Sequence, residues 1–361
     1  MASAQRPSDA ADLGPVSVGE FDSEDHFAMA ASLADQLEEG WKAARDDLRA
    51  FKPPVDRPDG VVVCGMGGSA IGADVVRVCM PGLTVPFEVV RAYDLPAWVS
   101  PRTLVVAVSY SGNTEETLAC ADDAFARGCR PVCVATGGAL GALARKRDRP
   151  LVTVPPGMQP RAALGYLATS LAATLDWAGL VGDFAPQVAE AAEIVRSMAA
   201  ELHPAVPDEA NPAKPLARRL HGHVALIYGA GVTAPAARRW KGQINENGKA
   251  PAFFAEFPEL NHNEIVGWTG DPALARTMHV VLLVDPRANE RIARRIDYTA
   301  EHLSGRTAGV DVVTAAGESP FARVCSVITM GDFVSLYLAV LSGVDPTPVA
   351  AIEELKRHLR S

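Results

Sequence analysis

The sequence lacks an excess of basic residues. Its 361 residues include 34 lysines and arginines against 43 aspartates and glutamates, which gives a formal net charge of −9. No basic cluster stands out, and an acidic chain without one is a poor candidate for binding nucleic acid. A small anionic ligand is not excluded, because backbone amides and a few local cations can hold a phosphate on an acidic protein.

Cysteine is sparse, and its spacing does not suggest a zinc site. Of the six cysteines only Cys129 and Cys133 lie close together, and no second pair completes a ligand set. Most of the six stand inside apolar runs, as Cys64 does after Val61-Val62-Val63. We expect buried, reduced thiols in a cytoplasmic protein that needs no metal and no cofactor.

Long apolar segments are also missing. The first ten residues contain no apolar core of the kind that a signal peptide has. No uninterrupted apolar run approaches the roughly 18 residues that a membrane span needs. We therefore expect a soluble chain that does not engage a membrane.

The composition that is present is that of a globular protein. Hydrophobic residues make up 48% of the chain and charged residues 21%, and at about 150 residues per domain the length suggests roughly two domains. Residues 25–51 show the spacing of an amphipathic helix, whereas residues 1–22 are small and polar and indicate a flexible tail. Short apolar, mostly valine-rich runs, each typical of a buried strand, lie at residues 60–64, 86–90, 103–108, 131–135 and 151–154.

Helix-like segments, notably 114–127, separate these strands and predict a parallel sheet flanked by helices. The same alternation of strands and helices is repeated in the second half of the chain. Two further helices are expected within 163–202, followed by a Pro-rich linker near 204–215. Strand-like runs resume after it, and we predict an α/β protein of two similar domains, over residues 23–205 and 206–361. The runs that carry this second half lie at residues 224–231, 279–285 and 310–313.

A hydroxyl-rich loop follows the strand at 103–108 and leads directly into a helix. Ser109, Ser111 and Thr114 each offer a hydroxyl, and the helix N-terminus adds free N–H groups and a positive dipole end. Gly112 allows the backbone to bend close to a ligand. Helix capping would account for one hydroxyl but poorly for three, so we favour a phosphate site.

A glycine-rich turn, residues 65–72, follows the first strand and includes Gly68 and Ser69. It resembles a dinucleotide-binding loop only weakly, because the strict glycine spacing is not met and Arg91-Ala92-Tyr93, rather than an acidic residue, follow the second strand. Taken alone, a tight strand–helix turn explains it as well as a ligand loop does. Beside the hydroxyl loop, it is interpreted as the opposite wall of one sugar-phosphate pocket.

Three further residues are candidates for chemistry. Arg161 follows a Pro-rich segment and could stabilise an oxyanion, although a surface arginine is the ordinary alternative. Glu246, between two asparagines, could act as a base, and His262, also between two asparagines, could shuttle a proton. For each of these two alone, a solvated helix residue or a loop histidine would be the more ordinary interpretation.

These motifs, in this order, resemble those of the bifunctional phosphoglucose/phosphomannose isomerases, which are built from two sugar isomerase (SIS) domains. The resemblance covers roughly residues 25–361, and Asn261-His262-Asn263 is its most discriminating element. It implies an aldose–ketose isomerase of carbohydrate metabolism that acts on hexose 6-phosphates in glycolysis and gluconeogenesis. It also implies a homodimer.

The resemblance also assigns roles. The phosphate would be bound by Gly68, Ser69, Ser109, Ser111 and Thr114. Arg161 would stand near the enediolate, Glu246 would transfer the proton, and His262 would open the sugar ring in the neighbouring subunit's site. Lys356, on a C-terminal helix, is the candidate for a further site lysine, while it stays open whether Thr347 is the family's site threonine.

Two other classes of protein share parts of this pattern. A sugar-phosphate-binding regulator without catalysis would keep the phosphate loop and lose the acid/base residues, and it would also need a DNA-binding domain. The second class comprises amidotransferase-type aldosamine enzymes and sugar-phosphate deaminases. An amidotransferase-type enzyme would need a separate glutaminase domain, for which two SIS-like halves leave no room. The sequence therefore favours the isomerase.

Overall fold

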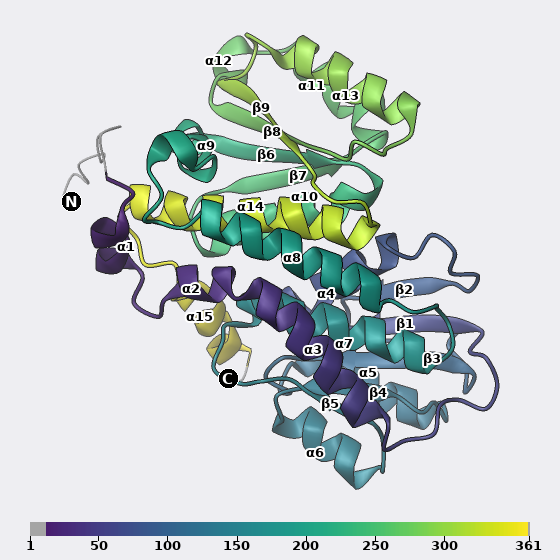
Figure 1. Cartoon of the computed structure of the whole chain (residues 1–361). Coiled ribbons are helices and arrows are strands. Elements are labelled where there is room, and N and C mark those ends of the chain that lie inside the picture. Colours follow the sequence, from purple (N-terminus) through teal and green to yellow (C-terminus); the bar gives the residue numbers. More distant parts are fainter. Residues whose placement is uncertain (1–11, 360–361) are drawn as a thin grey trace. The chain divides into compact units, whose positions relative to one another are not determined.

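The computed structural model describes residues 12–359 (Figure 1). The chain separates into two compact units. We call residues 32–197 with 316–326 the first-sheet unit, and residues up to 31, 198–315 and from 327 onward the second-sheet unit.

The first-sheet unit contains a five-stranded parallel sheet in the order β2-β1-β3-β4-β5. Every residue of the two central strands, β1 and β3, is buried. Strands covered on both faces read as unbroken apolar runs, which is why the valine-rich segments predicted them. The strands are β1 (Gly60–Cys64), β2 (Phe87–Val90), β3 (Thr103–Val108), β4 (Val132–Ala135) and β5 (Leu151–Thr153).

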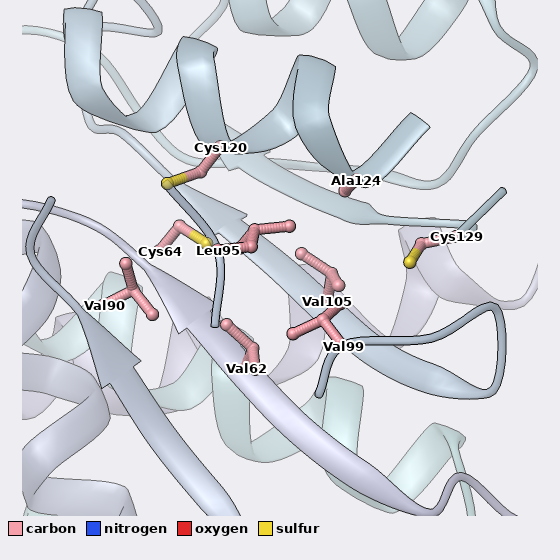
Figure 2. Close-up of a cluster of buried hydrophobic side chains, with 9 residues drawn as sticks. All are labelled: Val62, Cys64, Val90, Leu95, Val99, Val105, Cys120, Ala124 and Cys129. Carbon is pink, nitrogen blue, oxygen red and sulfur yellow. The ribbon is translucent and has the colours of Figure 1, made fainter. Parts of the chain in front are cut away.

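Helices cover both faces of this sheet. On one face, Val62 and Cys64 of β1 pack against Cys120 of α5, as Figure 2 shows, and α6 packs beside α5. Helices α3, α4 and α7 pack on one another and on the sheet. All six cysteines are buried thiols, as predicted. The helices of this unit are α3 (Leu33–Leu48), α4 (Gly68–Val78), α5 (Glu115–Ala126), α6 (Gly138–Lys146), the short 3₁₀ helix η1 (Pro160–Ala162), α7 (Leu164–Trp177) and α8 (Ala185–Glu201).

The second-sheet unit contains a four-stranded parallel sheet in the order β7-β6-β8-β9. Its apolar core joins Leu226 and Val280 of the sheet to Ile296 and Leu303 of α13. The strands are β6 (Val224–Gly229), β7 (Ala252–Glu256), β8 (Met278–Val284) and β9 (Gly309–Thr314). The helices are α1 (Pro15–Phe21), α2 (His26–Ala31), α9 (Ala213–Leu220), α10 (Ala234–Glu246), α11 (Glu264–Gly267), α12 (Pro272–Ala275), α13 (Glu290–Leu303) and α15 (Ala350–His358), with the 3₁₀ helices η2 (Asp208–Ala210), η3 (Gly231–Thr233) and η4 (Glu259–His262).

Two parallel sheets flanked by helices confirm the predicted fold class. Helix α14 (Pro320–Leu341) is long and mostly apolar, although Arg323 and Asp332 interrupt its apolar residues. It is the one helix within residues 12–359 that is long and apolar enough to cross a membrane, and 94% of its most apolar window is buried in protein. Burial of that kind is typical of the core helix of a globular fold.

Three local expectations differ from the structure. Residues 15–21, expected in a loose tail, form α1 with Val18 buried, while residues 1–11 lie outside the described part. The helix expected over 25–51 is divided at Ser32 into α2 and α3. Within the expected linker, Lys214 is buried and its Nζ donates to the carbonyl oxygens of Pro204 and Val206 at 2.9 and 2.7 Å, which ties the segment down.

Candidate functional site

The hydroxyl loop lies where β3 ends and α5 begins. Ser109 is fully buried, and its Oγ lies 2.8 Å from Oγ1 of Thr114. The Thr114 N–H donates to Ser109 Oγ at 3.3 Å. Thr114 occupies the N-cap position of α5, yet its side chain makes no capping bond. Helix capping therefore does not explain this hydroxyl, and the free N–H groups of the first turn remain beside it.

Gly112 allows the loop to fold. Its φ is +70°, and a Cβ there would lie 2.0 Å from the carbonyl oxygen of Gly137. The Leu140 N–H also donates to the Gly112 carbonyl at 2.9 Å. Only glycine combines that backbone conformation with so close an approach. Ser111, in contrast, is exposed, and its Oγ accepts the Asn113 N–H at 3.2 Å.

The glycine-rich turn lies against the hydroxyl loop. The Tyr110 N–H donates to Ser69 Oγ at 3.2 Å. A Cβ on Gly68 would lie 2.6 Å from the Pro160 carbonyl oxygen and 2.9 Å from the Arg161 nitrogen. The turn that opens α4, the hydroxyl loop and η1 therefore meet in one place. In open parallel sheets, this end of the strands is where ligands bind.

Arg161 is not a surface arginine, because only 4% of it is exposed. Gln36 of α3 holds the turn around it: its Nε2 donates to the Ala162 carbonyl at 2.9 Å, and its Oε1 accepts the Gly165 N–H at 3.1 Å. A buried arginine whose backbone meets the turn that opens α4 suits a site for an anion.

Tyr110 is a site residue that the sequence did not single out. Its hydroxyl donates to the Pro155 carbonyl at 2.8 Å and accepts the Met158 N–H at 3.0 Å. Burial raises the pKa of this phenol, so it stays protonated. One residue thus joins the hydroxyl loop to the Pro-rich segment before Arg161. The partners lie 45 residues or more away along the chain, so no local pattern could have indicated them.

Glu246 is the last residue of α10, and buried contacts hold that helix in place. Arg239 of α10 forms an ion pair with Asp332 of α14 at 2.7 Å, and Gln243 Nε2 donates to the same carboxylate at 3.0 Å. Asn247 Nδ2 donates to Ser335 Oγ at 2.9 Å. Glu246 itself is half-buried. A half-buried carboxylate at the end of a fixed helix suits a positioned base.

His262 ends η4, and its side chain is exposed. The flanking amides order the loop: Asn261 Nδ2 donates to Thr299 Oγ1 at 3.0 Å, and Asn263 Nδ2 donates to Glu259 Oε1 at 3.1 Å. The asparagines therefore hold the backbone and leave the imidazole accessible.

The C-terminal candidates differ from each other. Lys356 lies on α15, whose residues are exposed. Thr347 is buried, and its Oγ1 lies 3.0 Å from Nδ1 of the buried His26. Thr347 thus has a hydrogen-bonding partner within the second-sheet unit.

The first-sheet unit brings together Ser69, Ser109, Thr114 and Arg161, whereas Glu246, His262 and Lys356 belong to the second-sheet unit. Among residues 12–359, no group of three or more His, Cys, Asp or Glu side chains is arranged to hold a metal ion.

Comparison with known proteins identifies the family. Residues 209–359 match the model of the bacterial phospho-glucose isomerase C-terminal SIS domain. A bifunctional phosphoglucose/phosphomannose isomerase from Caldicellulosiruptor bescii is 41% identical over 335 residues, which cover 92% of this chain and 98% of that protein. One from Aquifex aeolicus is 34% identical, covering 93% and 99%. A D-glucosamine-6-phosphate 4-epimerase from Sulfolobus acidocaldarius is 33% identical over 63% of this chain and 70% of its own length.

Solved structures share the fold. A glucose-6-phosphate isomerase like protein from Thermus thermophilus superposes with a TM-score of 0.62 at 23% identity, covering 96% of this chain and 99% of that one. A second protein from the same organism reaches 0.72 at 18% identity, covering 96% and 92%. With 41% identity over nearly the whole length of a curated relative, the chain belongs to the bifunctional phosphoglucose/phosphomannose isomerase family.

Proposed function

We propose that this chain interconverts glucose 6-phosphate, and also mannose 6-phosphate, with fructose 6-phosphate through a cis-enediolate. The observation that carries the proposal is the paired hydroxyls of Ser109 and Thr114 at the N-terminus of α5, next to Ser69 and the buried Arg161. Hydroxyls and helix N–H groups are what a sugar phosphate needs at its charged end, and a buried guanidinium can stabilise an oxyanion at the reacting carbons. The names of the relatives favour the same substrates.

The phosphate would bind at the hydroxyl loop. Gly68 has no side chain, so the glycine-rich turn can lie close to the backbone of Pro160 and Arg161 beside it. This arrangement needs no lysine at the phosphate. Holding the phosphate fixes the sugar's reacting carbons relative to the groups that move protons, which is the contribution of positioning to the rate.

Glu246 is proposed as the base that moves the proton between C2 and C1. Removing a proton from C2 of either aldose phosphate gives the same cis-enediolate, and protonation at C1 then gives the ketose. Because glucose and mannose phosphates differ only in configuration at C2, the shared intermediate erases that difference. Arg161 would stabilise the negative charge that develops on the enediolate oxygens.

Ring opening is assigned to His262, together with Lys356. An imidazole can shuttle a proton near neutral pH, which opening a hemiacetal requires. We propose a cytoplasmic homodimer in which each chain's exposed His262 serves the neighbouring site. No metal takes part in this scheme.

Proton exchange with solvent tests this mechanism. Fructose 6-phosphate incubated with the enzyme in deuterated water should give glucose and mannose 6-phosphates that carry deuterium at C2, detected by NMR. Glucosamine 6-phosphate, incubated in parallel, should show no conversion at C4. Product free of deuterium would argue against an enediolate, and conversion at C4 alone would favour the chemistry named for the Sulfolobus relative.

A further inference from the structure

A hollow lined by arginines lies beside α13 of the second-sheet unit. Its volume is about 320 Å³, and its lining residues are Asn261, Ile265, Arg291, Arg294, Arg295 and Tyr298. None of the residues proposed for catalysis or phosphate binding lines it. We call these residues the arginine pocket.

One face of α13 supplies the positive charge. Arg291, Arg294, Arg295 and Tyr298 stand at helix positions i, i+3, i+4 and i+7, so their side chains share a face. No aspartate or glutamate is among the lining residues, although the whole chain carries a net charge of −9. Three like charges around one hollow repel one another unless an anion lies between them.

The charges are poorly compensated by neighbouring side chains. Arg294 pairs with Glu290 at 2.5 Å, but both side chains are mostly exposed, and such pairs stabilise little. Arg291 and Arg295 make no ion pair with any residue between 12 and 359. Two guanidinium groups are therefore available to a ligand.

The chemistry of the lining indicates phosphate. Guanidinium groups bind phosphate oxygens through paired hydrogen bonds. Tyr298, 59% exposed, adds a phenol and a ring that stacks on His302 at 5.7 Å. The volume suits a small molecule. We propose that the arginine pocket binds a small phosphate-bearing metabolite at a site separate from the hydroxyl loop.

A short chain of hydrogen bonds connects the pocket to η4. Thr299 Oγ1 donates to the Arg295 carbonyl at 2.7 Å and accepts from Asn261 Nδ2 at 3.0 Å. Asn261 immediately precedes His262, and its Oδ1 is shielded from solvent with no hydrogen-bond partner in the described residues. A ligand held by Arg295 therefore lies next to the loop that carries His262, and its binding slows amide exchange there.

Calorimetric titration with inorganic pyrophosphate tests the site. The full-length Ser109→Ala/Thr114→Ala variant weakens phosphate binding at the hydroxyl loop, so the tightest binding that remains in it reports another site. It should bind one pyrophosphate per chain. Adding Arg291→Ala and Arg295→Ala should weaken that binding by about 100-fold, because two charge-assisted contacts are lost. Amide exchange in residues 259–264 should slow on binding only while both arginines are present.

A charge-matched control separates the pocket from net charge. Arg276→Ala with Arg306→Ala, in the same background, removes two arginines that line a different hollow, and it should keep the affinity. Thermal unfolding checks that each variant folds. If the variant that lacks both Arg291 and Arg295 does not fold, the single variant Arg291→Gln replaces it, and this variant should bind pyrophosphate about 10-fold more weakly. The site is refuted if the Ser109/Thr114 variant binds no pyrophosphate, or if the Arg276/Arg306 control loses affinity equally. Turnover is not measured, so failure here is distinct from failure of the proposed isomerase.

Discussion

Ser109 Oγ and Thr114 Oγ1 lie 2.8 Å apart at the N-terminal end of α5. They stand five positions apart along the loop, and the positive φ of Gly112 makes the intervening turn possible. Neither hydroxyl is needed for sheet pairing, and Thr114 does not cap the helix with its side chain. One hydroxyl donates to the other, and the hydroxyl proton that remains can be donated to an oxyanion.

The Ser109→Ala/Thr114→Ala variant should therefore bind sugar phosphate weakly. A hydrogen bond to a charged group contributes roughly 1.5–3 kcal/mol, so each lost hydroxyl should reduce the affinity by about one to two decades. Calorimetry with a phosphorylated inhibitor measures the change. Thr174→Ala, which removes a buried hydroxyl that bonds within α7, is the matched control. Unchanged affinity in the double variant would mean that the loop only shapes the helix terminus.

Glu246→Gln should keep the shape of the side chain and remove its basicity. We expect kcat to fall by ~10²–10⁴-fold, as is typical when a general base is lost, while substrate binding stays nearly intact. Steady-state kinetics together with calorimetry separate the two effects. Glu193→Gln, an exposed carboxylate of α8, should leave both unchanged. Full activity in the Glu246→Gln variant would show that Glu246 is not the base.

Mixing of two inactive variants tests whether His262 acts in the neighbouring subunit. Glu246→Gln and His262→Ala homodimers should each be nearly inactive. After both are unfolded and refolded together, a mixed dimer contains one site with both defects and one site with neither, so activity should partly return. If mixed dimers are confirmed by mass and no activity returns, His262 does not serve the partner's site.

Acid should weaken the second-sheet unit through Asp311. Partial burial by itself would raise the pKa of this carboxyl, but hydrogen bonds from His279 at 2.7 Å and from Arg219 lower it to about 2. A lowered pKa stabilises the fold above the ordinary pKa of about 4, and that contribution is lost as the pH falls toward 2.

Asp311→Asn should consequently lower the free energy of unfolding at pH 7 by about 1–2 kcal/mol, after allowance for solvent screening. Urea unfolding at a series of pH values measures the difference from the wild type. The difference should shrink between pH ~4 and pH ~2, because the wild-type carboxyl becomes protonated there. Parallel curves across that range would contradict the role given to this carboxylate.

Much of the fold could be predicted, because buried parallel strands have a strong local pattern. The fully apolar runs at β1 and β3 indicate a sheet that is covered on both faces. Strand β7 was not predicted, because it carries the exposed Phe253 and its burial is neither continuous nor alternating. The Pro-rich segment near 204–215 indicated a linker, whereas Lys214 within it is buried and donates to two backbone carbonyls.

Part of the candidate site could also be predicted, because it too has a local sequence pattern. Ser109 and Thr114 follow a strand and precede a helix, so their neighbourhood depends on local structure alone. The link from Tyr110 to Pro155 and the clamp of Gln36 on the turn after Arg161 depend on tertiary contacts between distant segments. Side chains of that kind carry no local signal, and only the folded chain shows them.

The most direct test of the central claim is a coupled assay of the purified, EDTA-treated wild-type protein with each of the two aldose phosphates. Fructose 6-phosphate formation would be followed from glucose 6-phosphate and from mannose 6-phosphate separately. We expect turnover of both, unchanged when zinc is added back. No turnover of either substrate would contradict the isomerase, and activity on mannose 6-phosphate only after zinc is restored would contradict the shared, metal-free enediolate mechanism.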